Sequence, residues 1–259
     1  MRLKTVALVA GLLCGIGAAT PGGAKERAAK PAAAAGDGMQ IEGVVGELDA
    51  TQVEKTLTEG RAELRKCYED ISGRLFYLGG KMEVKLLIAQ TGKARSVAML
   101  RSTVGSYEVE RCVVSLMQKM AFPQPKGGDG ELTFPVEFAA RTPVQAWQSD
   151  KIADAVHKAL PTWKSCQSKG KKPKAGEKSA GLASIRATLY VGPGGQVTSA
   201  GFSANDPIDD KVAGCLLDKV LALRLDDPLG KMAKVSYDLG AQHVGAGKSA
   251  GTEQASDEL

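Results

Sequence analysis

The cysteine thiols are the side chains of this sequence with the greatest capacity for chemistry. Four of its five cysteines form two pairs with similar spacing: Cys67 and Cys112 are 45 residues apart, and Cys166 and Cys215 are 49 apart. A structural zinc site needs clustered ligands such as C-x-x-C, and these four cysteines are isolated. A catalytic thiol needs a nearby base, and the chain of 259 residues has only two histidines. Disulfides therefore remain the favoured use of these cysteines.

Two further kinds of motif could carry chemistry, and each has a simpler structural interpretation. The glycine-rich run at residues 192–195 lacks the following helix and the lysine of a phosphate-binding loop, so a hairpin turn is favoured. The acidic pairs at residues 209–210 and 226–227 lack the other ligands of a calcium loop. No paired acid and base accompanies these motifs. We therefore expect no enzyme, no metal and no cofactor.

A pattern of apolar residues and turns recurs with an offset of 103 residues. The alternating apolar run at residues 82–88 falls on residues 185–191, and the run at residues 132–136 falls on residues 235–239. A glycine marks the turn after the first strand of each copy. Helical apolar stripes precede the first strand and follow the hairpin. The sequence thus predicts the α+β class: two tandem α-β-β-α-β domains, each a three-stranded antiparallel sheet with two helices on one face.

Each of the four cysteines lies on the apolar stripe of a predicted helix. In the first copy, the stripe at residues 53–71 includes Cys67 and predicts one helix of about five turns. Ser106 is the expected N-cap of the helix that carries Cys112. In the second copy, Pro161 falls within the first stripe and should kink or break that helix.

The two helices of a copy must bury their stripes on the same sheet face, because the other face alternates polar. Facing small residues on the two helices can then reach the Cα separation of roughly 4.4–6.8 Å that a disulfide needs. We therefore predict the disulfides Cys67–Cys112 and Cys166–Cys215, each contributing roughly 4 kcal/mol on the chain-entropy model. Buried free thiols are the alternative.

The N-terminus has the pattern of an export signal. Arg2 and Lys4 precede an apolar stretch at residues 5–19, which is shorter than the roughly 20 residues that span a bilayer. An exported chain favours disulfides. The net charge of +5 lies largely in predicted flexible segments, and no aromatics interleave with it, so no nucleic acid is expected. The expected segments are a signal peptide (1–24), a disordered linker (25–42), the first copy (43–141), the divergent second copy (147–240) and a disordered tail (241–259).

The third strand of each copy is expected to lie at a sheet edge, in the order second, first, third strand. Pro135 supports an edge position in the first copy and would blunt pairing there. The second copy has no such proline, so its third strand is the candidate site for strand addition by a partner. Alternatively, the two third strands pair with each other in a six-stranded sheet. The candidate strand consists of Val235, Ser236, Tyr237, Asp238 and Leu239.

Several motifs together resemble a known family. They are L-x-x-C-Y-E at residues 64–69, T-G at residues 91–92, V-x-x-C-V at residues 109–113 and F-P at residues 122–123. They resemble the C-terminal domain of the AgmX/PglI family of myxobacterial gliding-motility and envelope proteins, and more distantly the TonB C-terminal fold. Residues 43–139 match well, whereas residues 147–240 match only by spacing. The resemblance implies a periplasmic, non-enzymatic interaction module in an envelope assembly, either motility-related or TonB-like.

The expected function is therefore that of an exported envelope protein that binds other envelope proteins, in the periplasm or at the outer membrane, with no stable transmembrane segment after processing. The alternative is a lipoprotein acylated at Cys14, although Leu13 precedes it where a small residue is preferred. Such a protein would associate weakly with the membrane or cell wall. It would also bind an anionic polymer through a basic loop, whereas the simpler interpretation is that this loop is only solvated. The loop lysines are Lys169, Lys171, Lys172 and Lys174.

Overall fold

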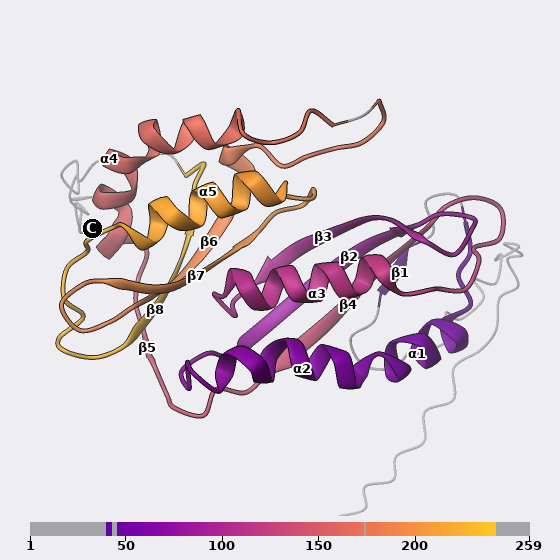
Figure 1. Ribbon diagram of the computed structural model, residues 1–259, viewed down its shortest axis with the longest axis horizontal. Coiled ribbons are helices and arrows are strands. Elements are labelled where there is room, and N and C mark those ends of the chain that lie inside the picture. Colours follow the sequence, from indigo (N-terminus) through magenta and orange to yellow (C-terminus); the bar gives the residue numbers. More distant parts are fainter. Residues whose placement is uncertain (1–39, 43–45, 174, 242–259) are drawn as a thin grey trace, which may run out of the picture. The chain divides into compact units, whose positions relative to one another are not determined.

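Helices and antiparallel strands alternate along the chain, as the predicted α+β class requires (Figure 1). The computed structural model describes residues 40–42, 46–173 and 175–241. All of these belong to one compact unit, Ala35–Leu259. The predicted signal peptide, most of the predicted linker and nearly all of the predicted tail lie outside the described residues. Division into two separate domains stays a prediction.

The N-terminal half (residues 46–141, with the strand before it) builds the first sheet. Its helices are α1 (Ala50–Glu59), α2 (Arg61–Ser72) and α3 (Tyr107–Lys119), and its strands are β1 (Gln40–Glu42), β2 (Gly80–Ile88), β3 (Ala94–Ser102) and β4 (Gly130–Phe138). The strand order is β1-β4-β2-β3, and all pairs are antiparallel. Helices α2 and α3 lie side by side over the strands (Figure 1).

The C-terminal half (residues 145–241) builds the second sheet. Its elements are β5 (Gln145–Ala146), α4 (Asp150–Gln167), the 3-10 turn η1 (Leu182–Ser184), β6 (Arg186–Val191), β7 (Val197–Ser203), α5 (Asp210–Leu221) and β8 (Ala233–Asp238). The order is β5-β8-β6-β7, and the two-residue β5 runs parallel to β8.

The predicted order of the three main strands is confirmed in both sheets, as β3-β2-β4 and β7-β6-β8. Each sheet has a further short strand that was not predicted, because β1 falls at the end of the predicted linker and β5 lies between the two predicted copies. The alternative of a six-stranded sheet is wrong. Strands β4 and β8 lie in different sheets, and each has a short strand on its outer side. The prediction that the third strand of each copy forms a sheet edge is therefore wrong where these short strands pair, at residues 131–133 and 233–234.

The helices differ from the prediction at three points. The expected five-turn helix is divided at Gly60, a residue with poor helix propensity, into α1 and α2. Helix α4 continues through Pro161, and Figure 1 shows that it changes direction along its length. Ser106 occupies the N-cap position of α3, but its side chain makes no capping hydrogen bond. In α5, Asp209 is the N-cap, and its carboxylate accepts a hydrogen bond of 2.8 Å from the Lys211 N–H.

Both predicted hairpin turns are present. Gly92 and Gly195 each have φ near +77°, in the left-handed region that favours glycine. A Cβ atom would also collide with backbone in both places, with the Phe122 carbonyl in the first turn and the Leu225 carbonyl in the second. These two positions therefore require glycine for both conformation and space.

The two sheets are buried differently. In the first sheet, β2 alternates between buried and partly exposed residues, so its face away from the helices meets solvent. In the second sheet, five successive residues of β6 are buried, as are six of the seven residues of β7. The prediction that the face away from the helices is polar and solvated is therefore wrong for the second sheet. The N-terminal half covers that face through α3 and β3.

Candidate interaction sites

Both predicted disulfides are present. Cys67 on α2 is bonded to Cys112 on α3, and Cys166 on α4 is bonded to Cys215 on α5, with the Cα atoms 5.6 Å apart in each bridge. Each bridge ties together the two helices that cover one sheet. The expectation of four buried cysteines is wrong for Cys112, which is exposed, whereas the other three are buried. Two such bridges are consistent with an exported protein.

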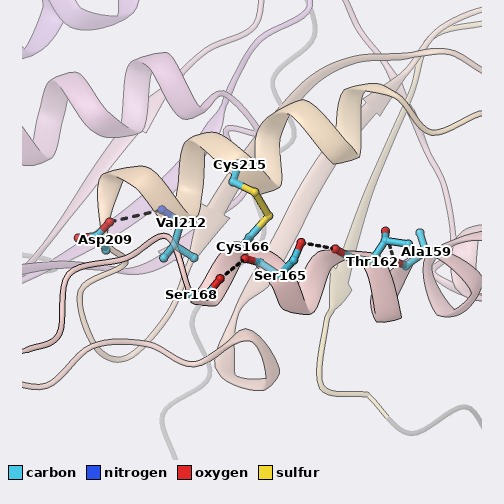
Figure 2. Close-up of a disulfide and its surroundings, with 8 residues drawn as sticks. All are labelled: Ala159, Thr162, Ser165, Cys166, Ser168, Asp209, Val212 and Cys215. Atoms are coloured by element: carbon cyan, nitrogen blue, oxygen red, sulfur yellow. Dashed lines mark hydrogen bonds between the residues drawn. A yellow bond between two sulfur atoms is a disulfide. The ribbon is translucent and has the colours of Figure 1, made fainter.

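The second bridge joins the last turn of α4 to the middle of α5 (Figure 2). Near it, hydroxyl groups bond back to the α4 backbone: Thr162 Oγ1 donates to the Ala159 carbonyl at 2.8 Å, and Ser165 Oγ donates to the Thr162 carbonyl at 2.7 Å. Both bonds run from a hydroxyl group to the carbonyl three residues earlier, and the two carbonyls lie on either side of Pro161 in the sequence.

The predicted polymer-binding loop is only partly described. Lys169, Lys171 and Lys172 are exposed, and Lys174 lies outside the described residues. The Lys171 N–H donates a hydrogen bond of 3.2 Å to the Asp209 carboxylate. An acidic group therefore lies at the start of the basic loop and reduces its positive potential.

The predicted partner-binding strand, residues 235–239, pairs with β6 on one side. On the other side β5 reaches only Ala233 and Lys234, so within the described residues no second strand pairs with residues 235–239. Asp238 accepts hydrogen bonds of 2.7 and 3.0 Å from the Arg186 guanidinium across β8 and β6. Partner binding at this strand stays a prediction.

A groove lies beside the other third strand, β4. Strand β4 pairs with β2 along its whole length, whereas among the described residues β1 pairs with residues 131–133. Beyond Thr133, the outer side of β4 borders a groove of about 820 Å³ between this strand and helices α1 and α2. Pro135 lies in this stretch, and its missing N–H leaves one hydrogen-bond donor fewer for an added strand. We call this space the β4 groove.

The β4 groove combines an apolar wall with a rim of mixed charge, to which Glu54 and Glu137 contribute beside two arginines. The Tyr68 ring stacks on Phe138 with centroids 4.4 Å apart, and its hydroxyl lies 2.8 Å from the Ala139 carbonyl oxygen. Two exposed arginines of α2, Arg61 and Arg65, also line the groove and are called the rim arginines. Together with the backbone of β4, the apolar wall can hold an extended chain that has apolar side chains.

A second unusual site is a buried carboxyl group where the two halves meet. Glu110 on α3 is 3% exposed; it accepts hydrogen bonds from the Ser102 hydroxyl at 2.5 Å and from the Phe202 N–H at 2.7 Å. Phe202 lies on β7, and the neighbouring Gly201 leaves room for the carboxylate, because a Cβ there would collide with it. Burial raises the pKa of Glu110 to about 8, against the opposing effect of its hydrogen-bond donors, which include the Gly105 backbone.

Further polar contacts surround this carboxyl group. The Ala204 N–H donates to the Met99 carbonyl at 2.8 Å, which joins the end of β7 to the interior of β3. Thr188 Oγ1 donates to the Ser102 carbonyl at 2.9 Å, and Ser199 Oγ donates to the Gly105 carbonyl at 2.7 Å. The C-terminal half thus satisfies backbone carbonyls that the loop after β3 would otherwise bury unpaired.

Tyr190 of β6 completes the contact between the halves. It is fully buried, packs within the core of the N-terminal half, and donates a hydrogen bond of 3.1 Å to the Gly79 carbonyl. Burial raises its pKa to about 12. The Lys234 ammonium lies 5.4 Å from the centre of the Tyr190 ring and donates to the carbonyls of Gly79 at 2.9 Å and Thr103 at 3.1 Å. Each half therefore keeps its own hydrophobic core, and Tyr190 extends from the C-terminal half into the core of the N-terminal half.

Two observations concern other kinds of site. Across the described parts of the chain, no three His, Cys, Asp or Glu side chains gather as a metal site requires. None of the helices in those parts is long and apolar enough to cross a bilayer. His157 lies edge-on to the Tyr237 ring, with centroids 6.4 Å apart, and His243 lies outside the described residues.

No protein-family model matches the chain, and no curated protein or solved structure matches it either. The resemblance to the AgmX/PglI and TonB C-terminal domains therefore stays a prediction.

Sequence reasoning missed Glu110 and the β4 groove. Small or hydroxyl residues recur at alternate positions on the face of β6 and β7 that Glu110 meets, namely Thr188, Ser199, Gly201 and Ser203. That pattern is a signal of close packing against another polar surface. The groove had no comparable signal, because its length depends on where β1 stops pairing.

Proposed function

We propose that this chain is an exported, non-catalytic interaction module of the cell envelope that binds an extended segment of a partner protein in the β4 groove. The observation that carries the proposal is the outer side of β4 beyond Thr133, with which no strand in the described residues pairs, next to a largely apolar space that can receive side chains. A strand edge supplies backbone hydrogen bonds, and alternate pockets supply specificity. The two disulfides support a location in the periplasm or at the outer membrane.

We also propose that the two halves are diverged copies of one TonB-like unit. Equivalent contacts at an offset of 103 residues support this. The Phe122 N–H donates to the Gly92 carbonyl at 2.9 Å, and the Leu225 N–H donates to the Gly195 carbonyl at 2.9 Å. Both disulfides also link the helix before each hairpin to the helix after it. The sequence of the second copy then differs from that of the first because its strands β6 and β7 are buried against the first copy.

The test is affinity purification of the mature protein from its own envelope fraction, with one side chain changed. Thr58 is exposed on α1 and lines the groove, so Thr58→Trp fills it without disturbing the core. Thr51→Trp, on the same helix but not lining the groove, is the matched control. We expect a specific partner to be retained by the control and lost at least about tenfold by Thr58→Trp, which is about 1.4 kcal/mol of binding free energy.

If Thr58→Trp and Thr51→Trp recover the same amount of partner, the partner does not bind in the β4 groove. The predicted edge at β8 is tested in the same experiment by Ser236→Pro, which introduces a proline where β8 pairs with β6 on one side and no described strand pairs with it on the other. Loss of the partner with Ser236→Pro, but not with Thr58→Trp, would move the binding site to the second sheet.

A further inference from the structure

We propose that a pocket where the two halves meet binds the C-terminal carboxylate of a partner protein whose last residue is aliphatic. The pocket has a volume of about 160 Å³ and lies at the N-terminus of α3, so we call it the α3 pocket. It shares no lining residue with the β4 groove, so the two sites can be tested separately. The lining residues used below are Arg74, Leu75, Ser106, Glu108, Leu217 and Leu221.

The first turn of α3 offers backbone donors that the described part of the chain does not use. No described group accepts a hydrogen bond from the N–H groups of Tyr107, Glu108 and Val109. Such groups at the start of a helix carry a partial positive charge and bind anions. Because Tyr107 and Glu108 both line the α3 pocket, an anion bound there meets this end of the helix.

Ser106 supplies a further donor at the same place. It occupies the N-cap position of α3, but its side chain makes no capping hydrogen bond. The residue is only 3% exposed and lines the pocket, and its hydroxyl has no hydrogen-bond partner among the described residues. A buried hydroxyl group without a partner costs free energy. A carboxylate oxygen in the pocket would accept its hydrogen bond and remove that cost.

Two exposed charged side chains of the pocket act in opposite directions. The Arg74 guanidinium and the Glu108 carboxylate lie 3.4 Å apart, so their charges largely cancel. The remaining positive potential comes from the N-terminus of α3. A carboxylate with a single charge suits this weak potential better than a phosphate group, which carries up to two charges and would be repelled more strongly by Glu108.

Three leucines give the α3 pocket an apolar part. Leu75 comes from the segment after α2, and Leu217 and Leu221 come from α5. Leu221 is 36% exposed, so an aliphatic side chain placed against it removes apolar surface from water. The volume of about 160 Å³ is below the roughly 300 Å³ at which pockets for drug-sized ligands begin, and suits a single residue. A carboxylate beside one aliphatic side chain is the chemistry of a chain end.

Titration of the full chain with the peptide acetyl-Gly-Gly-Leu, followed by NMR of the backbone amides, tests this site. We expect the amide signals of Tyr107 and Glu108 to shift with the free-acid peptide. The same peptide with a C-terminal amide should bind at least about tenfold more weakly, because it lacks the charged acceptor. The free-acid peptide should also raise the urea midpoint of unfolding, since both halves line the pocket and only the folded chain binds it.

Charge variants give effects of opposite sign. Glu108→Gln removes the repelling carboxylate and should strengthen binding of the free-acid peptide about two- to fivefold, whereas Arg74→Gln should weaken it by a similar factor. Arg101→Gln is the matched control, because Arg101 is also an exposed arginine in an ion pair but does not line the pocket. It should leave binding unchanged.

The hydroxyl and the apolar part are tested in the same titration. Ser106→Ala removes a donor that makes no hydrogen bond in the described structure, so it should weaken peptide binding without lowering stability. Leu221→Ser should weaken binding about threefold or more. Its matched control is Leu229→Ser, which changes a leucine that is 83% exposed and lies outside the pocket.

Three results would overturn the proposal. The first is the absence of amide shifts at about 10 mM free-acid peptide, where even a weak site would be occupied. The second is equal binding of the free-acid and amide peptides. The third is equally strong binding of 4-methylpentanoate, which would assign the pocket to free small carboxylates instead of protein chain ends. None of these results bears on the experiment with Thr58→Trp, because Thr58 lines only the β4 groove.

Discussion

Replacing Glu110 with glutamine should flatten the pH dependence of stability between about pH 4.5 and pH 8. In the folded protein burial raises the pKa of Glu110 to about 8, whereas the ordinary value is 4.5. Between these values the folded state holds one proton more than the unfolded state. The free energy of unfolding therefore falls as pH rises through this window, by about 1.4 kcal/mol per pH unit and about 5 kcal/mol across it. Below pH 4.5 this contribution is fully favourable, and above pH 8 the loss is complete.

Glutamine imitates the protonated carboxyl group. Its carbonyl can accept the hydrogen bond from the Phe202 N–H, and its amide can donate to the Ser102 hydroxyl oxygen, so the packing at Gly201 is kept. Glu110→Gln should therefore match the wild type near pH 5 and exceed it by several kcal/mol at pH 8. Tyr190, with a pKa of about 12, does not titrate in this window.

Urea denaturation of the oxidised protein at pH 5, 6.5 and 8 measures this difference. Glu108→Gln is the matched control, because Glu108 lies on the same helix, is exposed, and only approaches Arg74 at 3.4 Å. The control should retain the pH dependence of the wild type. If the wild type and Glu110→Gln lose stability equally between pH 5 and pH 8, the carboxyl group does not bind its proton in the folded state, and the reasoning from burial fails.

Three further outcomes follow from the same contacts. Gly201→Ala should destabilise the protein by about 1–3 kcal/mol in urea denaturation, because the new methyl group overlaps the Glu110 carboxylate. A mild thiol reductant followed by alkylation and mass spectrometry should open the bridge ending at exposed Cys112 before the bridge of buried Cys166. Tyr190→Phe should lower stability by about 1–2 kcal/mol, because it leaves a carbonyl of the N-terminal half without this donor.

For each of these three predictions, one experimental result would contradict it. An additive effect when Gly201→Ala is combined with Glu110→Ala would show that the two groups do not meet, since removing the carboxylate should relieve the overlap. Simultaneous reduction of both bridges would mean that exposure of Cys112 does not control its reactivity. A Tyr190→Phe variant as stable as the wild type would mean that solvent replaces the lost donor.

The elements that follow a clear apolar period could be predicted from the sequence. Strands such as Gly80–Ile88 alternate, and the helical stripes placed each cysteine near its partner. Strands of two or three residues, such as Gln145–Ala146, are too short to show a period. Helix α4 continues through Pro161 because apolar residues before and after this proline, including Val156 and Trp163, are buried in the core of the second half.

The candidate sites were harder to predict, because they depend on contacts between distant parts of the chain. Glu110 is 92 residues from Phe202, and no local pattern shows that a charged residue on α3 will be buried by β7. Tyr190 falls between the apolar positions of the run at residues 185–191, on the face predicted to be polar, yet it is buried in the core of the other half. The assumption that this face of each sheet meets solvent was therefore the source of the error.

The contact between the halves also means that neither half completes its interior alone. Synthesis delivers the N-terminal half first, and at that stage Glu110 and the core around Tyr190 still lack groups that the C-terminal half supplies. The second sheet in turn buries β6 and β7 on both faces only when it lies against α3 and β3. We therefore expect the docking of the two halves to be the last step of folding.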